Sequence, residues 1–183
     1  MGSGPTHDTF RAQLIVREQQ QLYDYWVERA GDRGLPRRQD IHPAHFPRLL
    51  PGISLIEVTD EDNRYRVRLA GTRLREIYER EITGMFLDDM DWGDRRDYWV
   101  SSYERVVGTG KPAQGVVRGP RASKEHLVQF WLRLPLSCDG QRVNMILCHD
   151  AFLPALDMPV GAGELTTQYG AIDQRMPSLV MGG

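Results

Sequence analysis

Residues 65–92 constrain the fold of this chain most, because a strand pattern there passes directly into two short helical segments. Tyr65, Val67 and Leu69 alternate with three arginines, so one strand face is apolar and the other carries guanidinium groups. We therefore expect a strand over residues 64–70, placed at a sheet edge or with one face in water.

The segment after this strand predicts two short helices. Gly71 ends the strand, and Thr72 is the predicted N-cap of the first helix. The inward stripe of that helix consists of Leu74, Ile77 and Tyr78. A Thr-Gly step at residues 83–84 interrupts the helical pattern before a second apolar cluster. That cluster consists of Phe86, Leu87 and Met90.

Length and charge set the broad class of the protein. A chain of 183 residues is long enough for one domain with extensions and a core that needs no disulfides. A formal net charge of −2 gives no long-range attraction to nucleic acid or to an anionic membrane. The chain has no apolar run near the roughly 18 residues of a membrane span, and no signal-peptide pattern. We expect a soluble cytoplasmic protein, and we set residues 1–4 aside as a cloning remnant.

The two cysteines are expected to be reduced thiols. If Asp139 and Gly140 form the two-residue loop of a hairpin, Cys138 lies at the turn. Cys148 then lies about 23 Å down the returning strand, at about 3.3 Å per residue. That separation is far beyond disulfide reach, and a cytoplasmic location also favours free thiols.

The N-terminal region predicts one long helix over residues 9–30, which ends before Gly31. At 1.5 Å per residue it is about 33 Å long. Its partly apolar stripe consists of Leu14, Leu22, Tyr25 and Trp26. The helix either caps the sheet of its own domain or forms a dimer interface, and different turns can do both.

The remaining pattern predicts an α+β domain. Residues 35–52 hold four prolines and are expected to be a linker that lies on the core, with one helical turn at 44–50. A longer helix, capped by Asp94, is expected over residues 94–109. The five expected strands are residues 53–59, 64–70, 114–118, 126–136 and 141–150. We predict a five-stranded antiparallel sheet with helices on one face. The predicted units are residues 1–34, 35–152 and an irregular tail, 153–183.

The order of these segments resembles a PAS domain. The motifs that carry the resemblance are Leu69-Ala70-Gly71-Thr72, Thr83-Gly84-Met85-Phe86-Leu87, Gly110-Lys111-Pro112 and the turn at Asp139-Gly140. More narrowly, Leu22-Tyr23-Asp24-Tyr25-Trp26 followed by Gly34-Leu35-Pro36 and Arg38 is similar to a subfamily of small alphaproteobacterial PAS proteins. The resemblance covers about residues 15–152. It implies a stand-alone sensory and protein-interaction module.

The expected hairpin predicts which residues could line a ligand pocket. A loop at residues 139–140 pairs Leu136 with Val143, Leu134 with Met145, Leu132 with Leu147 and Phe130 with His149. The resemblance implies that this apolar face is the pocket floor, below a roof of helices. The expected ligand-binding residues are Leu74, Ile77, Tyr78, Phe86, Tyr98, Trp99, Phe130, Leu132, Met145, Leu147 and His149. The opposite face, with Trp131, Arg133, Ile146 and Cys148, is expected to carry the N-terminal helix or a partner.

Two polar groups of the predicted pocket have alternative roles. His149 either bonds a polar group of a ligand or packs on Phe130 and bonds a backbone carbonyl. The hydroxyl groups of Tyr78, Tyr98 and Tyr103 either face the pocket or belong to core side chains.

The cofactor and the ligand are not identified by the sequence. The resemblance implies an axial histidine on the longer helix of a haem-binding PAS domain, and residues 94–109 contain none. It implies an adduct-forming cysteine for covalent flavin photochemistry, and residues 82–90 contain none. Non-covalent flavin stays open.

Neither a metal site nor a strong anion site is predicted. An EF-hand loop from Asp89 would need a glutamate at its twelfth position, where the chain has Val100. His42 and His45 have no further ligand pattern beside them. The loop cations Arg118, Arg121 and Lys124 are expected to be solvated, with phosphate binding as the alternative.

Three functions remain in competition. The first is a sensory module that binds a small apolar or amphipathic ligand, or signals through a protein partner or as a homodimer formed by the N-terminal helix, or does both. The second is a scaffold whose core is filled by its own side chains. The third is a small cone-shaped enzyme that uses Glu57, Asp60 or Glu61, although no phosphate loop, nucleophile elbow or zinc spacing is present.

Overall fold

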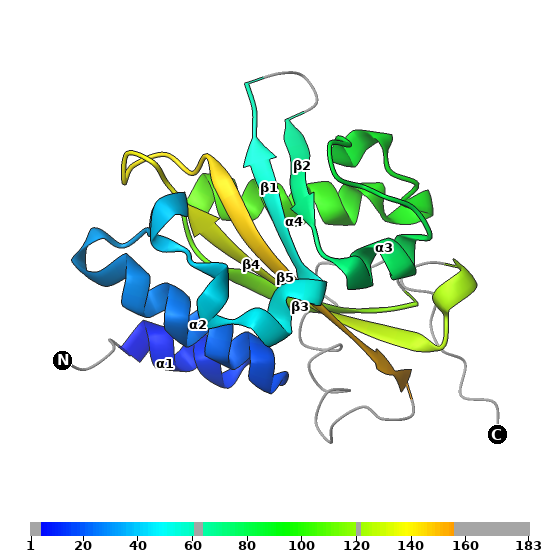
Figure 1. Ribbon diagram of the computed structural model, residues 1–183, viewed down its shortest axis with the longest axis horizontal. Helices are drawn as coiled ribbons and strands as arrows, with labels where there is room; N and C mark the ends of the chain where they lie inside the picture. Colours follow the sequence, from blue (N-terminus) through cyan, green and yellow to red (C-terminus); the bar gives the residue numbers. More distant parts are fainter. Residues whose placement is uncertain (1–4, 61–63, 120–121, 156–183) are drawn as a thin grey trace.

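The computed structural model describes residues 5–60, 64–119 and 122–155 (Figure 1). Five antiparallel strands form one sheet in the order β2-β1-β5-β4-β3. They are β1 (Ile53–Val58), β2 (Tyr65–Ala70), β3 (Ala113–Arg118), β4 (Leu127–Leu136) and β5 (Met145–Pro154). The predicted five-stranded antiparallel sheet is therefore confirmed. Most of the predicted turn at 60–63 and most of the predicted tail lie outside the described residues.

Four α-helices accompany the sheet: α1 (Pro5–Ala12), α2 (Arg17–Ala30), α3 (Thr72–Tyr78) and α4 (Arg96–Thr109). Short 3-10 turns occur at Gly31–Arg33, Arg38–Asp40, Pro43–His45, Pro47–Gly52, Leu87–Asp89, Gly93–Arg95 and Ala122–Lys124. The turns between residues 38 and 52 replace the single turn expected in the proline-rich linker. Among the described residues, no helix is long and apolar enough to span a bilayer.

The helices cover both faces of the sheet (Figure 1). On one face, the Trp26 indole of α2 donates a hydrogen bond to the carbonyl of Pro135, 2.9 Å away. On the other face, Tyr103 of α4 packs on Tyr65 of β2 with ring centroids 5.5 Å apart. The expectation of helices on one face thus holds for α3 and α4, whereas α1 and α2 cover the opposite face. Strand β4 is buried along its whole length as a result.

The N-terminal helix is two helices, and the prediction of one continuous helix was wrong. The chain leaves helical geometry between residues 13 and 16, where Val16 is extended. Leu14 and Val16 are buried by this break, and Val16 packs on Val128 and Phe130 of the sheet. Burial of β-branched Val16 against the sheet stabilises the extended conformation more than helical propensity stabilises a straight helix.

Helix α2 covers the sheet of its own domain, as one of the two alternatives predicted. Its buried residues are Gln19, Leu22, Tyr23, Trp26 and Ala30. Helix α1 folds back on α2 through a bidentate ion pair between Arg11 and Asp24, with N–O distances of 2.6 and 2.9 Å. A dimer interface at the N-terminal helices stays a prediction.

The loop of the β4–β5 hairpin spans residues 137–144, so the predicted two-residue loop was wrong. One Asp139 oxygen accepts hydrogen bonds from the Gln141 and Arg142 amides and from the Ser137 hydroxyl. These bonds lower the pKa of Asp139 to about 2 and favour a wider turn. The register consequently pairs Leu136 with Met145.

That register differs from the predicted one by two residues. Leu132 lies opposite His149, and Phe130 lies opposite Ala151. Because side chains alternate with a period of two, an even shift leaves each residue on its predicted face. The composition of the two hairpin faces was therefore predicted correctly even though the pairs were not.

Two predicted helix caps also lie at different residues. Gly71, and not Thr72, is the N-cap of α3, and no side chain caps that helix. A Cβ atom at Gly71 would lie 2.2 Å from the Leu50 carbonyl oxygen, so the linker requires a glycine there. Helix α4 begins at Arg96 after a 3-10 turn, which displaces its start from the predicted cap at Asp94.

Candidate functional site

The two faces of the β4–β5 hairpin meet different helices. Val16, which precedes α2, packs on Phe130, so the face that alternates with Phe130 carries the N-terminal segment. Trp99 and Tyr103 of α4 lie over Trp131 and Arg133. The face of β4 that carries Trp131 and Arg133 therefore lies under α4. Strands β4 and β5 thus present their face that is apolar except for His149 to α2 and their mixed face to α4.

This arrangement corrects the predicted pocket floor. Leu74, Ile77, Tyr78 and Trp99 are buried on α3 and α4, with Phe86 and Tyr98 half-buried nearby. The predicted floor residues Phe130, Leu132, Met145, Leu147 and His149 lie on the opposite face of the sheet. The structure therefore does not bring the two predicted halves together. Alternation along a strand separates two faces, but it does not tell which face a given helix covers.

A buried ion pair lies on the α4 side of the sheet. Arg133 donates from Nη1 to Asp150 Oδ2 at 3.1 Å and from Nη2 to Oδ1 at 3.0 Å, and both side chains are 3% exposed. Gln129 donates from Nε2 to the same Asp150 Oδ1 at 2.8 Å. We call these three residues the Arg133 network. It connects the two long strands by charge as well as by the backbone ladder.

Aromatic rings surround the Arg133 guanidinium. Its central carbon lies 5.6 Å from the ring centroid of Trp99, 5.3 Å from that of Tyr103 and 5.4 Å from that of Trp131. Such contacts stabilise a desolvated cation by about 1–2 kcal/mol each. The Trp131 indole donates to the Tyr98 hydroxyl at 2.9 Å, so this ring is also tied to α4. Helix α4 is therefore coupled to Arg133 by direct contact of its aromatic side chains with the guanidinium and with the Trp131 ring.

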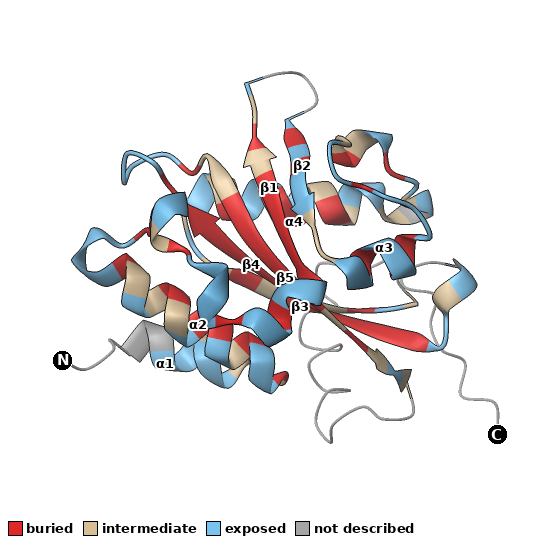
Figure 2. Ribbon diagram, in the orientation of Figure 1, coloured by how far each residue is buried: buried red, intermediate tan, exposed pale blue. Residues whose placement is uncertain are grey.

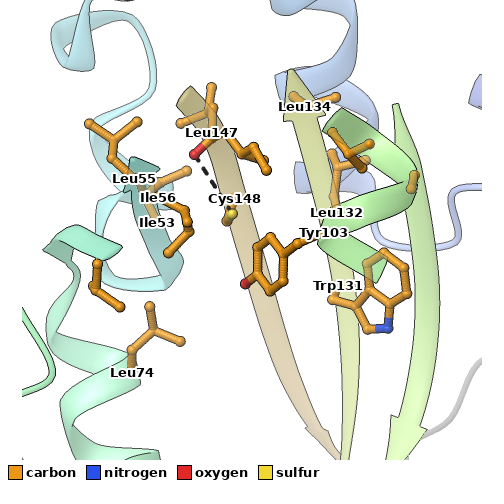
Figure 3. Packing of buried hydrophobic residues seen from close by; sticks show 14 of the residues in the cluster. Ile53, Leu55, Ile56, Leu74, Tyr103, Trp131, Leu132, Leu134, Leu147 and Cys148 are labelled. Atoms are coloured by element: carbon orange, nitrogen blue, oxygen red, sulfur yellow. Dashed lines mark hydrogen bonds between the residues drawn. The ribbon is translucent and has the colours of Figure 1, made fainter. Parts of the chain in front are cut away.

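The titrating groups at this site are fixed in one protonation state near neutral pH. Burial acts to lower the pKa of Arg133, but the Asp150 carboxylate raises it well above its usual value, so the cation persists. Burial raises the pKa of Tyr103 well above its usual range. It also raises the pKa of Cys148 to about 11, and Figure 3 shows this thiol beside Tyr103. Arg133, Tyr103 and Cys148 therefore all hold their protons near neutral pH.

Two polar atoms of the Arg133 network have no hydrogen-bond partner within the described part of the chain. They are Arg133 Nε, a donor, and Gln129 Oε1, an acceptor. Tyr65 OH on the same face of the sheet is also unpaired there. A buried unpaired polar group costs about 1–3 kcal/mol.

The sequence of β4 carries one signal that points to this network. Gln129 and Arg133 occur inside LVQFWLRLPL, a run long and apolar enough for a strand buried on both faces. A charged residue inside such a run must find a partner, because burying an isolated charge is very costly. The partner, Asp150, is the last residue of the next predicted strand, and it could not be paired with Arg133 without the correct register.

Gln19 of α2 contacts the hairpin directly behind the Arg133 network. Its Nε2 donates to the carbonyl of Phe130 at 2.9 Å and to the carbonyl of His149 at 3.3 Å, and the side chain is buried. Those carbonyls belong to the peptide groups that precede Trp131 and Asp150 in the chain. Trp131 and Asp150 lie opposite each other in the register. The Gln19 side chain of α2 thus donates hydrogen bonds to the backbone next to Trp131 and Asp150, whose side chains lie on the α4 face.

His149 packs beside the linker. A Cβ atom added to Gly52 would lie 3.2 Å from His149 Nε2, so the ring is close against that backbone. Its Nδ1 has no partner among the described residues, and burial lowers the pKa of the imidazole. His149 is therefore a neutral buried group on the α2 face, away from the rings of α4.

The other predicted candidates lie apart from this site. Asp60 forms an exposed ion pair with Arg142, and Lys124 pairs with Glu79 at 3.1 Å. His45 Nδ1 lies 3.3 Å from the Tyr25 hydroxyl at the surface. Glu61 and Arg121 lie outside the described residues. Among residues 5–60, 64–119 and 122–155, no three potential metal ligands converge.

Comparisons with known proteins identify the family of the chain. A family model described as PAS domain matches residues 15–148. Among solved structures, the chain is similar to a variant of RsLOV, with 17% identity and a TM-score of 0.48 over 74% of this chain and 83% of that one. It is also similar to the Rhodobacter sphaeroides LOV protein, with 14% identity and a TM-score of 0.43 over 72% of this chain and 76% of that one. No curated protein matches the sequence. The family match includes Gln19, Gln129 and Arg133.

Proposed function

Because the chain belongs to the PAS domain family, we propose that it is a sensory module that responds to a small molecule between α4 and the sheet. The small molecule is proposed to contact the Arg133 network and the aromatic rings around it. It passes through the sheet to the N-terminal helices, and from there to a partner protein or to a second copy of the chain. No catalytic step is proposed.

The buried Arg133–Asp150 pair is the observation that carries this proposal. Packing alone does not require such a pair, because apolar residues of similar volume usually give equal or greater stability. A buried pair whose flanking donor and acceptor lack partners is the kind of arrangement found at functional sites. The molecule that fits would be small, with a polar group for Arg133 Nε and Gln129 Oε1 and a flat apolar body for the rings.

Gln19 supports the proposed route to the N-terminal helices. A molecule that moves Asp150 or Trp131 also moves the peptide groups that accept hydrogen bonds from Gln19. It can shift α2 only to the extent that it binds the two arrangements of α2 with different affinities. The proposed ligand is neither haem nor a flavin that forms a covalent adduct, since residues 94–109 contain no histidine and residues 82–90 contain no cysteine.

Hydrogen exchange tests the coupling without knowledge of the ligand. Gln19→Leu removes the contact with the hairpin, and Gln21→Leu makes the same change at an exposed position of α2. We expect Gln19→Leu, but not Gln21→Leu, to increase amide exchange in β4 and β5 around Trp131 and Asp150 at least threefold. Equal exchange in the two variants would contradict the proposed route.

Native mass spectrometry and thermal-shift screening test the sensing step. We expect the purified protein to retain a small molecule, or a metabolite library to contain a compound that raises its melting temperature. Gln129→Leu should reduce that response, whereas Gln114→Leu, on the adjacent strand and the opposite face, should not. A protein that retains no molecule and responds to no compound would refute the sensing step.

A scaffold with a filled core is the second candidate function. The observation that favours it is the ring packing itself, with three ring centroids within 5.6 Å of the Arg133 guanidinium. A scaffold predicts that changes at the Arg133 network alter stability alone. It also predicts that deletion of residues 1–30 abolishes dimer or partner binding, which the sensory proposal shares. The ligand screen therefore separates the two.

A further inference from the structure

Strand β2 exposes one of its faces to solvent. Tyr65 and Val67 are buried against the α4 side, whereas Arg66, Arg68 and Leu69 are exposed. Figure 2 shows exposed residues along β2, while the central strands are largely buried. Leu69 pairs with Leu55 of β1, which in turn pairs with Leu147 of β5. The exposed face of β2 therefore continues the sheet face that α2 covers farther along.

The two large apolar residues that are exposed in the described part of the chain belong to segments that meet at Gly71. They are Leu69, 45% exposed, and Leu50, 37% exposed, the latter in the turn Pro47–Gly52. Gly71 holds the two segments together, because its amide donates to Ile53 and its α-carbon lies against the Leu50 carbonyl. We call Leu50, Arg66, Arg68 and Leu69 the β2 patch.

The charge of the β2 patch is positive although the whole chain is slightly negative. The Arg66 guanidinium lies 5.9 Å from the Phe86 ring centroid, and its Nε donates to the Gly84 carbonyl at 3.4 Å. Glu57 lies opposite Arg66 in the strand register. Arg68 has no acidic partner among the described residues. One cation is thus held in place, and a second is available to a partner.

The arginines and leucines of the β2 patch indicate which side chains a partner must present. Interfaces are rich in arginine, and a buried apolar centre inside a polar rim supplies most of the binding energy. Two copies of the β2 patch would bring four arginines together, so the positive charge disfavours self-association through it. A nucleic acid would use the arginines but has no role for two exposed leucines.

We propose that the β2 patch binds an amphipathic segment of a partner protein in which acidic side chains lie next to large apolar ones. The acidic groups pair with Arg66 and Arg68, and the apolar groups cover Leu50 and Leu69. This inference names a docking surface for a partner that is separate from the N-terminal helices, and it rests on the proposed sensory function only for the existence of a partner.

Selection from a library of random short peptides displayed on phage tests the surface directly. We expect the peptides that bind the full-length protein to be enriched in aspartate or glutamate beside leucine, phenylalanine or tryptophan. Their affinity should fall about tenfold or more in Arg66→Ser/Arg68→Ser and in Leu69→Ser, as at an interface centre. It should also fall as salt concentration rises. Arg75→Ser/Arg80→Ser, at exposed positions next to and within α3, removes the same charge elsewhere and should leave the affinity unchanged.

Three results would overturn the proposal. The selected peptides could lack acidic residues, or they could bind the patch variants as tightly as the unaltered protein. Alternatively, duplex DNA or vesicles of anionic lipid could bind in a patch-dependent way while no peptide does. Circular dichroism melts of each variant check that the exposed substitutions leave the fold intact. Peptide binding at the patch by a protein that retains no molecule and responds to no compound would remove the sensory proposal and leave this one standing.

Discussion

Replacing Asp150 with leucine is expected to destabilise the protein far more than the same change at an exposed ion pair. The variant removes the acceptor of both Arg133 Nη groups and of the Gln129 amide, and it leaves a buried guanidinium without a counter-charge. Loss of one partner from a buried pair costs about 3–5 kcal/mol of unfolding free energy. Because a chain of this size loses about 2–4 °C of melting temperature per kcal/mol, we expect a decrease on the order of 10 °C.

The matched control is the exposed pair Arg11–Asp24. It is also bidentate, but its side chains are 44% and 48% exposed. Water replaces the lost partner there, so Asp24→Leu should cost less than about 1 kcal/mol. Both are bidentate arginine–aspartate pairs, although Arg11 donates from Nε and Nη2 and Arg133 from its two Nη groups, so burial is the main difference between them.

A double-mutant cycle measured by urea unfolding completes the test. Arg133→Met should cost about as much as Asp150→Leu, while the double variant should lie within about 1 kcal/mol of the unaltered protein, because it buries no charge. The coupling free energy should therefore be about 5 kcal/mol or more. A double variant whose destabilisation equals the sum of the single ones, or an Asp150→Leu cost below about 1 kcal/mol, would refute this account of the site.

Three further predictions concern glycine packing, a buried histidine and thiol access. A Cβ atom at Gly115 would lie 2.5 Å from the Trp131 indole, so Gly115→Ala should cost about 1–3 kcal/mol and change tryptophan fluorescence. Gly108→Ala, in α4 with open space around it, should instead stabilise by about 0.5–1 kcal/mol. Burial lowers the pKa of His149, so the unfolded chain binds a proton more readily, and stability should fall as the pH drops below about 6.5. His149→Gln should flatten that dependence in urea unfolding, and unchanged curves would contradict it. Exposed Cys138 should react quickly with a thiol reagent and buried Cys148 only after unfolding; two fast thiols would show that the core opens.

Local patterns determined the elements of the fold. Alternation of Tyr65, Val67 and Leu69 with arginines predicted a strand with one apolar and one wetted face. Tyr65 and Val67 are buried and the arginines exposed as predicted, but Leu69 lies beyond an irregularity in the β1–β2 register and is exposed. The apolar spacing of Leu74, Ile77 and Tyr78 predicted the buried side of α3. These signals work because backbone periodicity places side chains on faces before any tertiary contact forms.

The candidate site depended on contacts that no local pattern encodes. The width of the β4–β5 loop follows from hydrogen bonds that Asp139 accepts, and that loop sets the register that places Leu132 opposite His149. Arg133 and Asp150 share one face by alternation, but the bond between them depends on that register. The predicted pocket floor was wrong for a related reason: the mixed face of the hairpin, and not the apolar one, lies under α4.

The sequence by itself thus determined the strands, the short helices and which side chains share a face, because these follow from backbone geometry over a few residues. Only the tertiary structure decided which face each helix covers, where the N-terminal helix breaks and which charges meet. Those outcomes depend on the burial of Val16 by the sheet, on the Gln19 contact with two strands and on the desolvation of Arg133 beside Asp150. Each of these interactions joins segments that are distant in the chain, so it contributes to stability only once those segments are packed together.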